Sequence, residues 1–376
     1  MSVRILDFAP GERTDEFIDA GAALYRDDDS YVAPLRMELR DRLTPGKNPF
    51  WEHARGRLFL AERDGQIVGR ISAQIDDEHL RHHKDGAGFF GFFDCVDDAS
   101  VGDALMNAAR DWLREQGMAT MRGPFSLSIN EESGVLIDGF DTPPALQMPH
   151  HLPHQHTLIE NAGLEKAKDL WAWKYVTEEP KPRARRAWEQ IEALPEVKFR
   201  SVDTSRMREE LDKILEIFND AWSDNWGFVP ATEAEVEQGA KDMRLILDPR
   251  LAFFAEIKSE PVGIVICLPN LPELIHDLDG RLVPFGWAKF FWRLKVQKPK
   301  SARLMMLGIK RKLRGVKRYG ALSTAMYAEL AYRGIRYGYK WAELSWTLED
   351  NRAINLGIKA MGGKVYKTYR IYEGAL

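Results

Sequence analysis

The chain of 376 residues contains an internal repeat, and this repeat limits the possible fold more than any other feature. The segment RLFLAERDGQIVGRISA at 57–73 resembles RLAFFAEIKSEPVGIVI at 250–266. In both, an apolar run ends at Ala-Glu, a polar turn follows, and a second run begins with Val-Gly. This pattern predicts a β-hairpin in each half of the chain. The repeat therefore indicates two copies of one folding unit.

The same order of elements surrounds each hairpin. A strand and an amphipathic helix precede it, at 3–8 and 15–34 in the first half and at 197–202 and 208–230 in the second. Strand, helix and strand follow it, at 89–96, 100–117 and 118–125 and again at 302–309, 320–338 and 339–347. Apolar residues recur at helical spacing in the two later helices. We expect a mixed α/β fold with two domains, 1–180 and 187–376, joined by a charged, proline-bearing linker at 177–186.

Composition narrows the functional classes. Hydrophobic residues make up 44% of the chain, which predicts a globular protein, and the net charge of −4 argues against general nucleic-acid binding. Cys95 and Cys267 lie in apolar runs and are predicted core thiols in a reducing compartment. No apolar run reaches the length of a membrane span or follows Met1 as a signal core. We expect a soluble, cytoplasmic protein.

The order of elements resembles that of the GNAT acyltransferase superfamily. The second half carries the resemblance in AELSWTLEDNRAINLGIKAMGGKVYKTYRIYE, residues 342–373. In the family, a strand there leads to an Asn-x-x-Ala-Ile helix, a glycine stop and a tyrosine-rich last strand. The resemblance implies two tandem GNAT-like domains, acyl transfer from a thioester, and a splayed strand end at ELSWTLEDN, residues 343–351. It also assigns Asn351 to the binding of the acyl carrier.

The stretch LGIKRKLRGVKRYGAL at 307–322 stands where the family has its pyrophosphate loop. In such a loop, backbone N–H groups and a helix N-terminus face an anion, and glycines permit close approach. The loop of the family usually reads Arg/Gln-x-x-Gly-x-Gly/Ala. Gly315 fits the first glycine of this motif, but Lys317 occupies the position of the second, and Gly320 follows three residues later. The interpretations are a carrier-phosphate site, a basic surface for the acidic helix of an acyl carrier protein, or a solvated turn. The residues expected to contact acyl-CoA or acyl carrier protein are Leu307, Ile309, Lys312, Arg314, Gly315, Lys317, Gly320 and Asn351.

The first half departs from this loop pattern. Its corresponding stretch, DDASVGDAL at 97–105, retains only Gly102 and carries Asp97, Asp98 and Asp103, which would repel phosphate. We expect this half to support the second one or to help bind the acceptor. Candidate acceptor residues are Asn130 and Glu131, in the polar cluster SINEESG, and His150; a surface turn is the alternative for the cluster.

Two further segments resemble a particular group of bacterial tandem GNAT proteins over nearly the whole chain. They are GPFSLSINEESGVLIDGFDTPPALQMPHH at 123–151 and AWSDNWGFVP at 221–230. The group is that of the GNAT-like bacterial ceramide synthases, which acylate the amine of a sphingoid base. The resemblance implies a long-chain amine as the acceptor and (dihydro)ceramide as the product.

The segment LVPFGWAKFFWRLKVQKPK at 282–300 supports a lipid substrate independently, because it alternates aromatic and basic side chains. Such a segment suits peripheral contact with an anionic membrane. Alternatively, its aromatics pack inside the protein while its lysines stay solvated. Trp287 is the residue of this segment that we assign to substrate binding.

Acyl transfer to nitrogen needs a neutral amine, a polarised thioester carbonyl and a proton for the leaving thiolate. The resemblance makes Glu343 and Glu349 the candidate bases, with Asp350 as a third, and Tyr372 or Tyr369 the proton donor. Backbone amides near Met306 to Ile309 would polarise the carbonyl. Asp350 could instead cap the helix that begins near Arg352.

A metal site is not expected. PHHLPHQH at 149–156 contains four histidines, but its prolines interrupt any helix that would align them and no cysteine is nearby. Two rivals to a lipid N-acyltransferase remain. One is an acetyl-CoA-dependent enzyme acting on a small polar amine. The other, favoured by the missing second glycine, is a catalytically silent GNAT-fold binding module.

Overall fold

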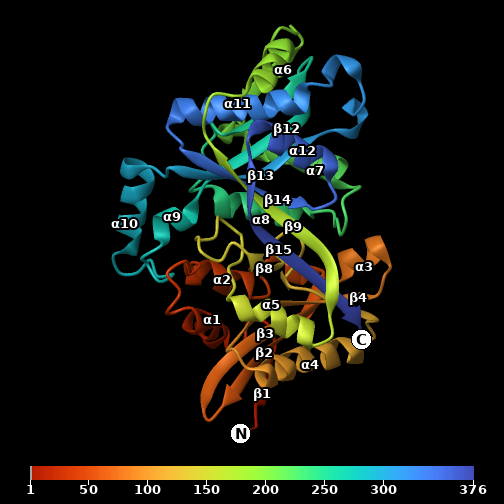
Figure 1. The fold of residues 1–376 in the computed structure, drawn as a ribbon, viewed down its shortest axis with the longest axis vertical. Helices are drawn as coiled ribbons and strands as arrows, with labels where there is room; N and C mark the ends of the chain where they lie inside the picture. The colour runs from red at the N-terminus through yellow and green to blue at the C-terminus, as the bar shows by residue number, and fades with distance from the viewer. Residues whose placement is uncertain (1) are drawn as a thin grey trace. The chain divides into compact units, whose positions relative to one another are not determined.

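A computed structural model describes residues 2–376. The chain forms two compact units. Unit 1 comprises Met1–Leu170, Ile275–Phe290 and Lys367–Leu376, and unit 2 comprises Trp171–Leu274 and Phe291–Tyr366. Both units are mixed α/β structures, which confirms the predicted fold class (Figure 1). The predicted domain limits at 180 and 187 stay a prediction. Residues 182–186, expected within a linker, instead begin helix α6 (Pro182–Glu192), because proline is well tolerated in a first helical turn.

Unit 1 is built on a sheet whose strands pair in the order β1-β2-β3-β4-β5-β15. The β4–β5 pair is parallel, and the other pairs whose registers are described are antiparallel. The strands of this sheet are β1 (Arg4–Phe8), β2 (Ala54–Arg63), β3 (Gln66–Asp76), β4 (Ala87–Cys95), β5 (Thr120–Gly123) and the end of β15 (Lys364–Ala375), with β8 (Val135–Asp138) also paired to β15. Short β6 (Phe125–Ser126) and β7 (Glu132–Ser133) form a separate ribbon.

Unit 1 has the two predicted helices, although the first ends at Leu24 instead of continuing to residue 34, and it has further short helices that were not predicted. The helices of this unit are α1 (Thr14–Leu24), α2 (Arg36–Arg42), η1 (Pro49–Glu52), α3 (Asp77–His83), α4 (Ala99–Glu115) and α5 (Pro153–Asn161). The apolar face of α4, including Leu105, Ala109 and Leu113, is buried against the sheet, as its periodicity predicts. Asp98, expected only to repel phosphate, is the N-cap of α4 and accepts a hydrogen bond from the Ser100 amide.

Unit 2 has the same arrangement. Its strands follow the order β9-β14-β13-β12-β11-β10, with β13 and β14 parallel and the β10 to β13 pairs antiparallel. These strands are β9 (Glu165–Val176), β10 (Val197–Ser201), β11 (Ala252–Ile257), β12 (Glu260–Pro269), β13 (Ser301–Ile309) and β14 (Trp341–Leu348). The predicted hairpins are β2–β3 in unit 1 and β11–β12 in unit 2.

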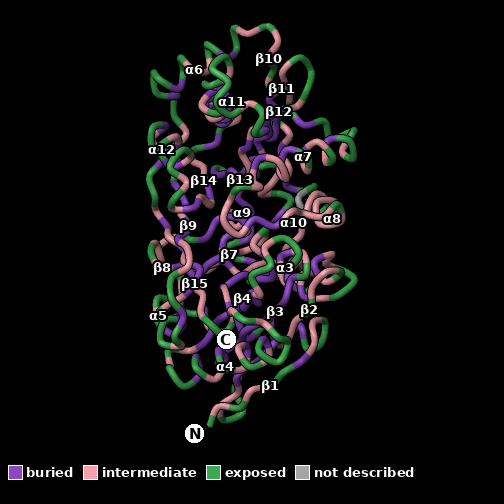
Figure 2. Tube along the Cα trace, turned by 90° about the vertical axis from the view of Figure 1, so that its right-hand side faces the viewer, coloured by how far each residue is buried: buried purple, intermediate pink, exposed green. Residues whose placement is uncertain are grey.

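The helices that begin in unit 2 differ in length. They are α6, η2 (Thr204–Arg206), α7 (Met207–Trp222), α8 (Glu233–Met243), α9 (Leu271–Ile275), η4 (Arg311–Leu313), η5 (Lys317–Tyr319), α11 (Leu322–Tyr337) and α12 (Arg352–Met361). The segment between α9 and β13 holds α10 (Gly286–Trp292) and the π-helical η3 (Arg293–Gln297). In Figure 2 the buried stretches follow the strands, whereas the helices expose their outer sides.

Two cores cover opposite faces of the unit 2 sheet, because side chains alternate along a strand. Ala302, Leu304 and Leu344 belong to the core beneath α11, α6 and α12. On the other face, Ile264 and Met306 pack with Ile214 and Ile217 of α7. Gly308 allows α7 to approach closely, since a Cβ there would lie 2.2 Å from the Trp222 ring. Cys95 and Cys267 are buried free thiols, as predicted.

Candidate active site

Strands β13 and β14 of unit 2 separate where the sequence predicts a splayed strand end. Their parallel pairing covers Ser301–Leu304 and Trp341–Leu344, although β13 continues to Ile309 and β14 to Leu348. The far side of β13 stays paired with β12 up to Ile309, so the strand is held straight along one edge only. A register shift in the β12–β13 ladder between Ile266 and Cys267 marks a bulge beside this point. The separation leaves the β14-facing edge of residues 305–309 outside the described pairing.

A buried polar network lies at the point of separation. Arg303 and Glu343 are partners in the parallel register, one residue before the pairing ends, and expose 5% and 0% of their surface. Ser345 and Tyr366 both donate hydrogen bonds to the Glu343 carboxylate. Arg303 Nε donates to Ser345 Oγ at 2.9 Å and lies 3.9 Å from Glu343 Oε1. Because a buried carboxylate is costly unless hydrogen-bonded or paired with a charge, these three neighbours account for its burial.

The end of β14 holds the other predicted acids. Glu349 is half-buried and its carbonyl accepts a hydrogen bond from Asn355 Nδ2 at 3.2 Å. Asp350 is exposed, and the helix cap that sequence assigned to it as an alternative belongs to Asn351, whose side chain accepts from the Ile354 amide. Asn351, predicted to contact the carrier, is thus the N-cap of α12. The amide geometry explains this choice, since an asparagine oxygen at N-cap can reach the third helical N–H.

The predicted phosphate loop, residues 310–321, connects β13 to α11. Leu307 and Ile309 are half-buried on β13, and the short helices η4 and η5 form the loop itself. Gly315 has φ +80 and open space where a Cβ would stand, so its left-handed conformation suits glycine. Gly320 has φ −60, which any residue adopts, and Lys317 is exposed at the start of η5. One of the two motif glycines therefore has a conformational reason in this loop.

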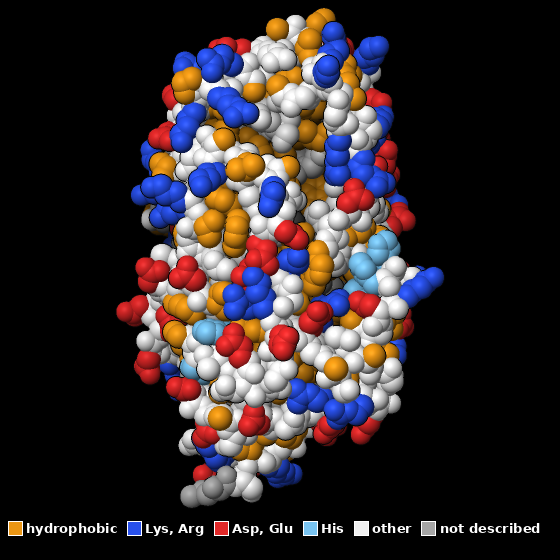
Figure 3. Space-filling model, turned by 45° about the vertical axis from the view of Figure 1, so that its right-hand side comes forward, with side chains coloured by type: hydrophobic (Ala, Val, Ile, Leu, Met, Phe, Trp, Pro, Cys, Tyr) orange, Lys and Arg blue, Asp and Glu red, His pale blue; other side chains and the backbone are white. Residues whose placement is uncertain are grey.

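Most basic side chains of this loop bind carboxylates of unit 2. Lys310 Nζ lies 2.6 Å from Glu216, and the Arg311 amide donates to Asp220 at 2.5 Å. The remaining ion pairs are Arg311 and Arg314 with Asp224, Lys312 with Glu260, and Arg318 with Glu196. Among the described residues, no carboxylate forms such an ion pair with Lys317. The loop is thus neither a bare solvated turn nor an unbalanced basic surface, and basic and acidic side chains also intermingle on the face drawn in Figure 3.

Tyr372, the predicted proton donor, belongs to unit 1. Its hydroxyl donates to Glu160 Oε1 at 2.7 Å, and burial raises its pKa above the usual value. Tyr369 is fully buried on the same strand. Tyr366, six residues before Tyr372, is the tyrosine that contacts Glu343. Sequence reasoning missed it together with Arg303 and Ser345, although the spacing of tyrosines along 366–372 was a visible signal.

The predicted acceptor residues of unit 1 lie in two polar clusters. Glu131 accepts from Arg42 Nε at 2.9 Å, and the Asn130 backbone N–H donates to Ser128 Oγ at 3.2 Å. His150 Nε2 lies 2.7 Å from Asp28 Oδ2, and burial lowers the pKa of this histidine. Trp287, the other residue assigned to substrate binding, is half-buried and packs edge-on against Phe290, with ring centres 6.3 Å apart.

The four histidines of 149–156 do not converge on a metal site. Pro153 occupies the first position of α5, so His154 and His156 are helical after all, whereas His150 and His151 precede the helix. His154 Nε2 binds the Cys95 carbonyl and His151 Nδ1 accepts from the Leu136 amide. Across residues 2–376, no group of three or more histidine, cysteine or acidic side chains is arranged to hold a metal ion.

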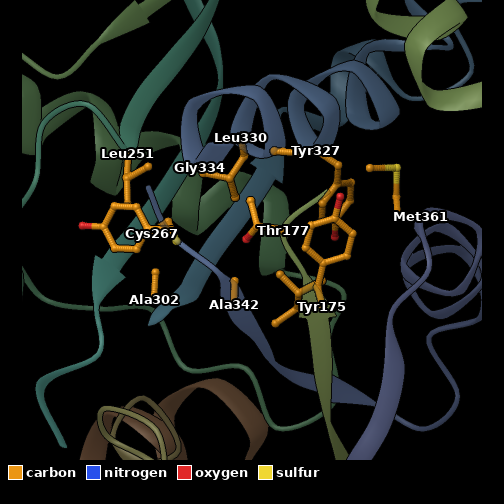
Figure 4. A pocket seen from close by; sticks show the side chains of 13 residues that line it. Tyr175, Thr177, Leu251, Cys267, Ala302, Tyr327, Leu330, Gly334, Ala342 and Met361 are labelled. Atoms are coloured by element: carbon orange, nitrogen blue, oxygen red, sulfur yellow. The ribbon is translucent and has the colours of Figure 1, made fainter. Parts of the chain in front are cut away.

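Unit 2 also contains a small apolar cavity between α11 and the sheet. Its volume is about 30 Å³, and its walls include Tyr175, Leu330, Gly334 and Met361 (Figure 4). Such a volume accommodates roughly one or two water-sized molecules. The cavity does not hold an acyl chain in this conformation, and it lies on the face of the sheet opposite to the Glu343 network, because Ala302 and Leu344 line it.

Comparison with known proteins places this geometry in a class. The structure is similar to a tandem GNAT protein from the clavulanic acid biosynthesis pathway, with a TM-score of 0.59 and 13% identity over 100% of this chain and 98% of that one. It is also similar to a GCN5-related N-acetyltransferase from Sphaerobacter thermophilus, with a TM-score of 0.53 and 15% identity over 99% of this chain and 95% of that one. No protein-family model matches the sequence. The fold is therefore that of tandem GNAT proteins, and the chain is a GNAT-type N-acyltransferase.

Relatives in sequence define the family more narrowly. The chain is 45% identical over 368 residues to the bacterial ceramide synthase of Caulobacter vibrioides, covering 96% of this chain and 94% of that protein. It is 38% identical over 359 residues to protein YghO of Escherichia coli, covering 95% and 91%. The chain belongs to the bacterial ceramide synthase family.

Proposed function

We propose that this protein transfers a fatty acyl group from acyl-CoA to the amine of a sphingoid base, giving a (dihydro)ceramide. Support for the acceptor comes from the 45% identity to a protein named a bacterial ceramide synthase, over nearly the full length of both chains. The observation that carries the reaction type is the splayed β13–β14 pair with the Glu343–Tyr366 hydrogen bond where the strands part.

The reaction forms a C–N bond and breaks a C–S bond. In our proposal the thioester lies along the unpaired edge of β13, where backbone N–H groups in the range 305–309 stabilise the developing oxyanion. The amine nitrogen attacks the carbonyl carbon and loses a proton to the Tyr366 oxygen while the phenol proton moves to Glu343. The reverse transfer delivers a proton to the departing thiolate, so that the products are an amide and free CoA thiol.

Arg303 and Ser345 act on Glu343 in this scheme rather than on substrate. Ser345 donates to Oε1, and Arg303 supplies positive charge nearby. Both hold the carboxylate in place, so that it can accept a proton in one step and return it in the next. Glu349, the other predicted base, lies just past the end of β14, six residues after Glu343; we assign it to the rim of the same site.

The geometry favours direct attack over an acyl-cysteine intermediate. Cys267 of unit 2 is buried among apolar side chains, and burial raises the pKa of its thiol far above the usual value. Burial has the same effect on the pKa of Cys95 in unit 1. Since the thiolate is the reactive form, neither residue is suited to act as a nucleophile.

Acyl-CoA is the donor that the loop charges favour. An acidic helix of an acyl carrier protein needs a basic surface with charge to spare, but Arg311, Arg314 and Lys312 are each bound to a carboxylate. A diphosphate concentrates more charge in less space and can displace carboxylates one by one.

For binding of the acceptor amine we retain two of the predicted residues. They are His150, which is paired with Asp28, and Trp287.

The proposal is tested by incubating the purified protein with palmitoyl-CoA and sphinganine and following free thiol and N-acyl product by mass spectrometry. We expect N-palmitoyl sphinganine, and slower or no product when palmitoyl-acyl carrier protein replaces the CoA ester. Acetylation of a small polar amine by acetyl-CoA, without any lipid product, would favour the small-amine rival. Absence of turnover with CoA esters and carrier-protein esters alike would favour a binding module.

A further inference from the structure

One surface segment exposes apolar side chains to an unusual degree. It comprises residues 281–298, which form α10 and η3 between α9 and β13. The side chain of Phe290 is 3% exposed and fixes the inner side of α10, and Arg293 holds the following turn by donating to the Leu274 carbonyl at 2.8 Å. The segment is therefore a held element with a distinct inner and outer side.

The outer side is apolar. Exposed fractions are 81% for Phe285, 76% for Val283, 63% for Val296 and 50% for Trp292. Five of the twelve large hydrophobic side chains that are exposed in the described chain fall within 283–296, including every aromatic one. Phe285 directly precedes α10, Trp292 is its last residue and Val296 lies in η3, so these exposed side chains follow one another along one short segment. Monomeric proteins rarely gather exposed apolar groups in this way unless the surface is used.

The charged side chains within this segment are all basic. No acidic residue occurs between Gly280 and Lys300, whereas Lys289, Lys295, Lys298 and Lys300 are all exposed. Lys289 is paired with Asp277. The other three lysines flank the apolar positions, and this combination complements a surface that is both apolar and anionic. No helix described by the structure is long and apolar enough to cross a bilayer, so contact would be with the headgroup layer.

We propose that residues 283–296 dock this protein on an anionic membrane surface, with Val283, Phe285, Trp292 and Val296 entering the headgroup layer and Lys295 and Lys298 facing lipid phosphates. The proposal rests on the proposed function to the extent that a sphingoid base and its amide reside in membranes. It goes further by naming the partner, an anionic bilayer, and the side chains that touch it.

Vesicle co-sedimentation tests the proposal with the full chain. Sucrose-loaded vesicles of phosphatidylcholine, with or without phosphatidylglycerol, are mixed with wild type and with the double variant Phe285→Ser/Trp292→Ser. We expect wild type to sediment with the anionic vesicles, and the double variant to lose binding by about tenfold or more. Lys295→Glu/Lys298→Glu should lose anionic binding only. The matched controls are Met37→Ser, which removes an apolar side chain 52% exposed on α2, and Lys47→Glu, and neither should change binding.

Other outcomes would overturn the proposal. Equal sedimentation of wild type and both double variants would mean that another surface contacts the membrane. If wild type bound neither kind of vesicle, the proposal of membrane docking would be wrong. If the Phe285→Ser/Trp292→Ser change converts a dimer to a monomer in sedimentation velocity, the surface joins two copies of the chain instead. Acylation of a water-soluble short-chain amino alcohol, measured on the same preparations, separates the two proposals: it should persist in the variants, and its absence in wild type would count against the proposed reaction alone.

Discussion

Tyr366 donates a hydrogen bond to the carboxylate of Glu343, which is wholly buried at the point where β13 and β14 part. The two residues are 23 positions apart in the chain, and Tyr366 is the half-buried residue of the pair. In our proposal the substrate therefore meets the phenol before the carboxylate. This order, from solvent to phenol to buried acid, is suited to a two-step proton relay.

Replacing Tyr366 by Phe should lower kcat for N-acylation by about two orders of magnitude, because the relay loses its first member. The KM for acyl-CoA should change little, since the phenol does not contact the phosphate loop in our scheme. Steady-state kinetics of thiol release measure both constants. Tyr332→Phe, on α11, is the matched control. If Tyr372→Phe slowed the reaction and Tyr366→Phe did not, the role would return to the tyrosine first predicted.

Gly315→Ala should weaken acyl-CoA binding severalfold and lower the free energy of unfolding by roughly 1 kcal/mol, because a Cβ is unfavourable at φ +80. Gly338→Ala separates the two effects. Gly338 ends α11 at φ +84 with similar open space, so its replacement should lower the free energy of unfolding by a comparable amount without weakening the binding of acyl-CoA. Thermal melts and calorimetric titration of a non-reactive acyl-CoA thioether give the two quantities. Equal loss of binding in both variants would show a general effect of strain.

Much of the fold could be predicted because its determinants are local. The hairpins and the α4 and α11 faces follow from periodicity and from the internal repeat. The splay near Glu343 was implied by the resemblance to the GNAT superfamily. Pairing across the sheet is not local. Residues 372–375 of β15 pair with β5 in unit 1, as Tyr372 does with Gly123, and nothing in the apolar pattern of that strand specifies this neighbour.

The candidate site was predictable in position but not in its contacts. The resemblance led to Glu343 and to the loop around Gly315, whereas the choice of Tyr366 over Tyr372 depends on which strand end faces β14. Ion pairs show the same limit. Asp220 and Asp224 precede the loop by about ninety residues, so no spacing rule indicates that α7 and the turn after it supply carboxylates to Arg311 and Arg314.

Asp224→Asn should strengthen acyl-CoA binding, by about two- to fivefold at low salt. Asp224 lies 3.3 Å from both Arg311 and Arg314 and is 62% exposed, so its removal frees two cations at little structural cost. The gain should shrink as salt rises, because exposed charges are screened. Titrations at two ionic strengths measure it, with Asp212→Asn, an exposed aspartate on α7, as the control. Weaker binding in Asp224→Asn would mean that this carboxylate shapes the loop for phosphate.

Unit 1 should lose stability on mild acidification, because burial lowers the pKa of His151 to about 4. The unfolded chain binds this proton near the ordinary histidine value of about 6.5, so between these values the unfolded state holds more protons than the folded one. Stability is therefore full above about pH 6.5 and falls, on the order of 1–3 kcal/mol, as the pH decreases toward 4. Calorimetric melts across this range should show a smaller slope against pH for His151→Gln, whatever its stability at neutral pH, and an unchanged slope for His82→Gln, an exposed position on α3. An unaltered slope in His151→Gln would mean that other groups take up the proton.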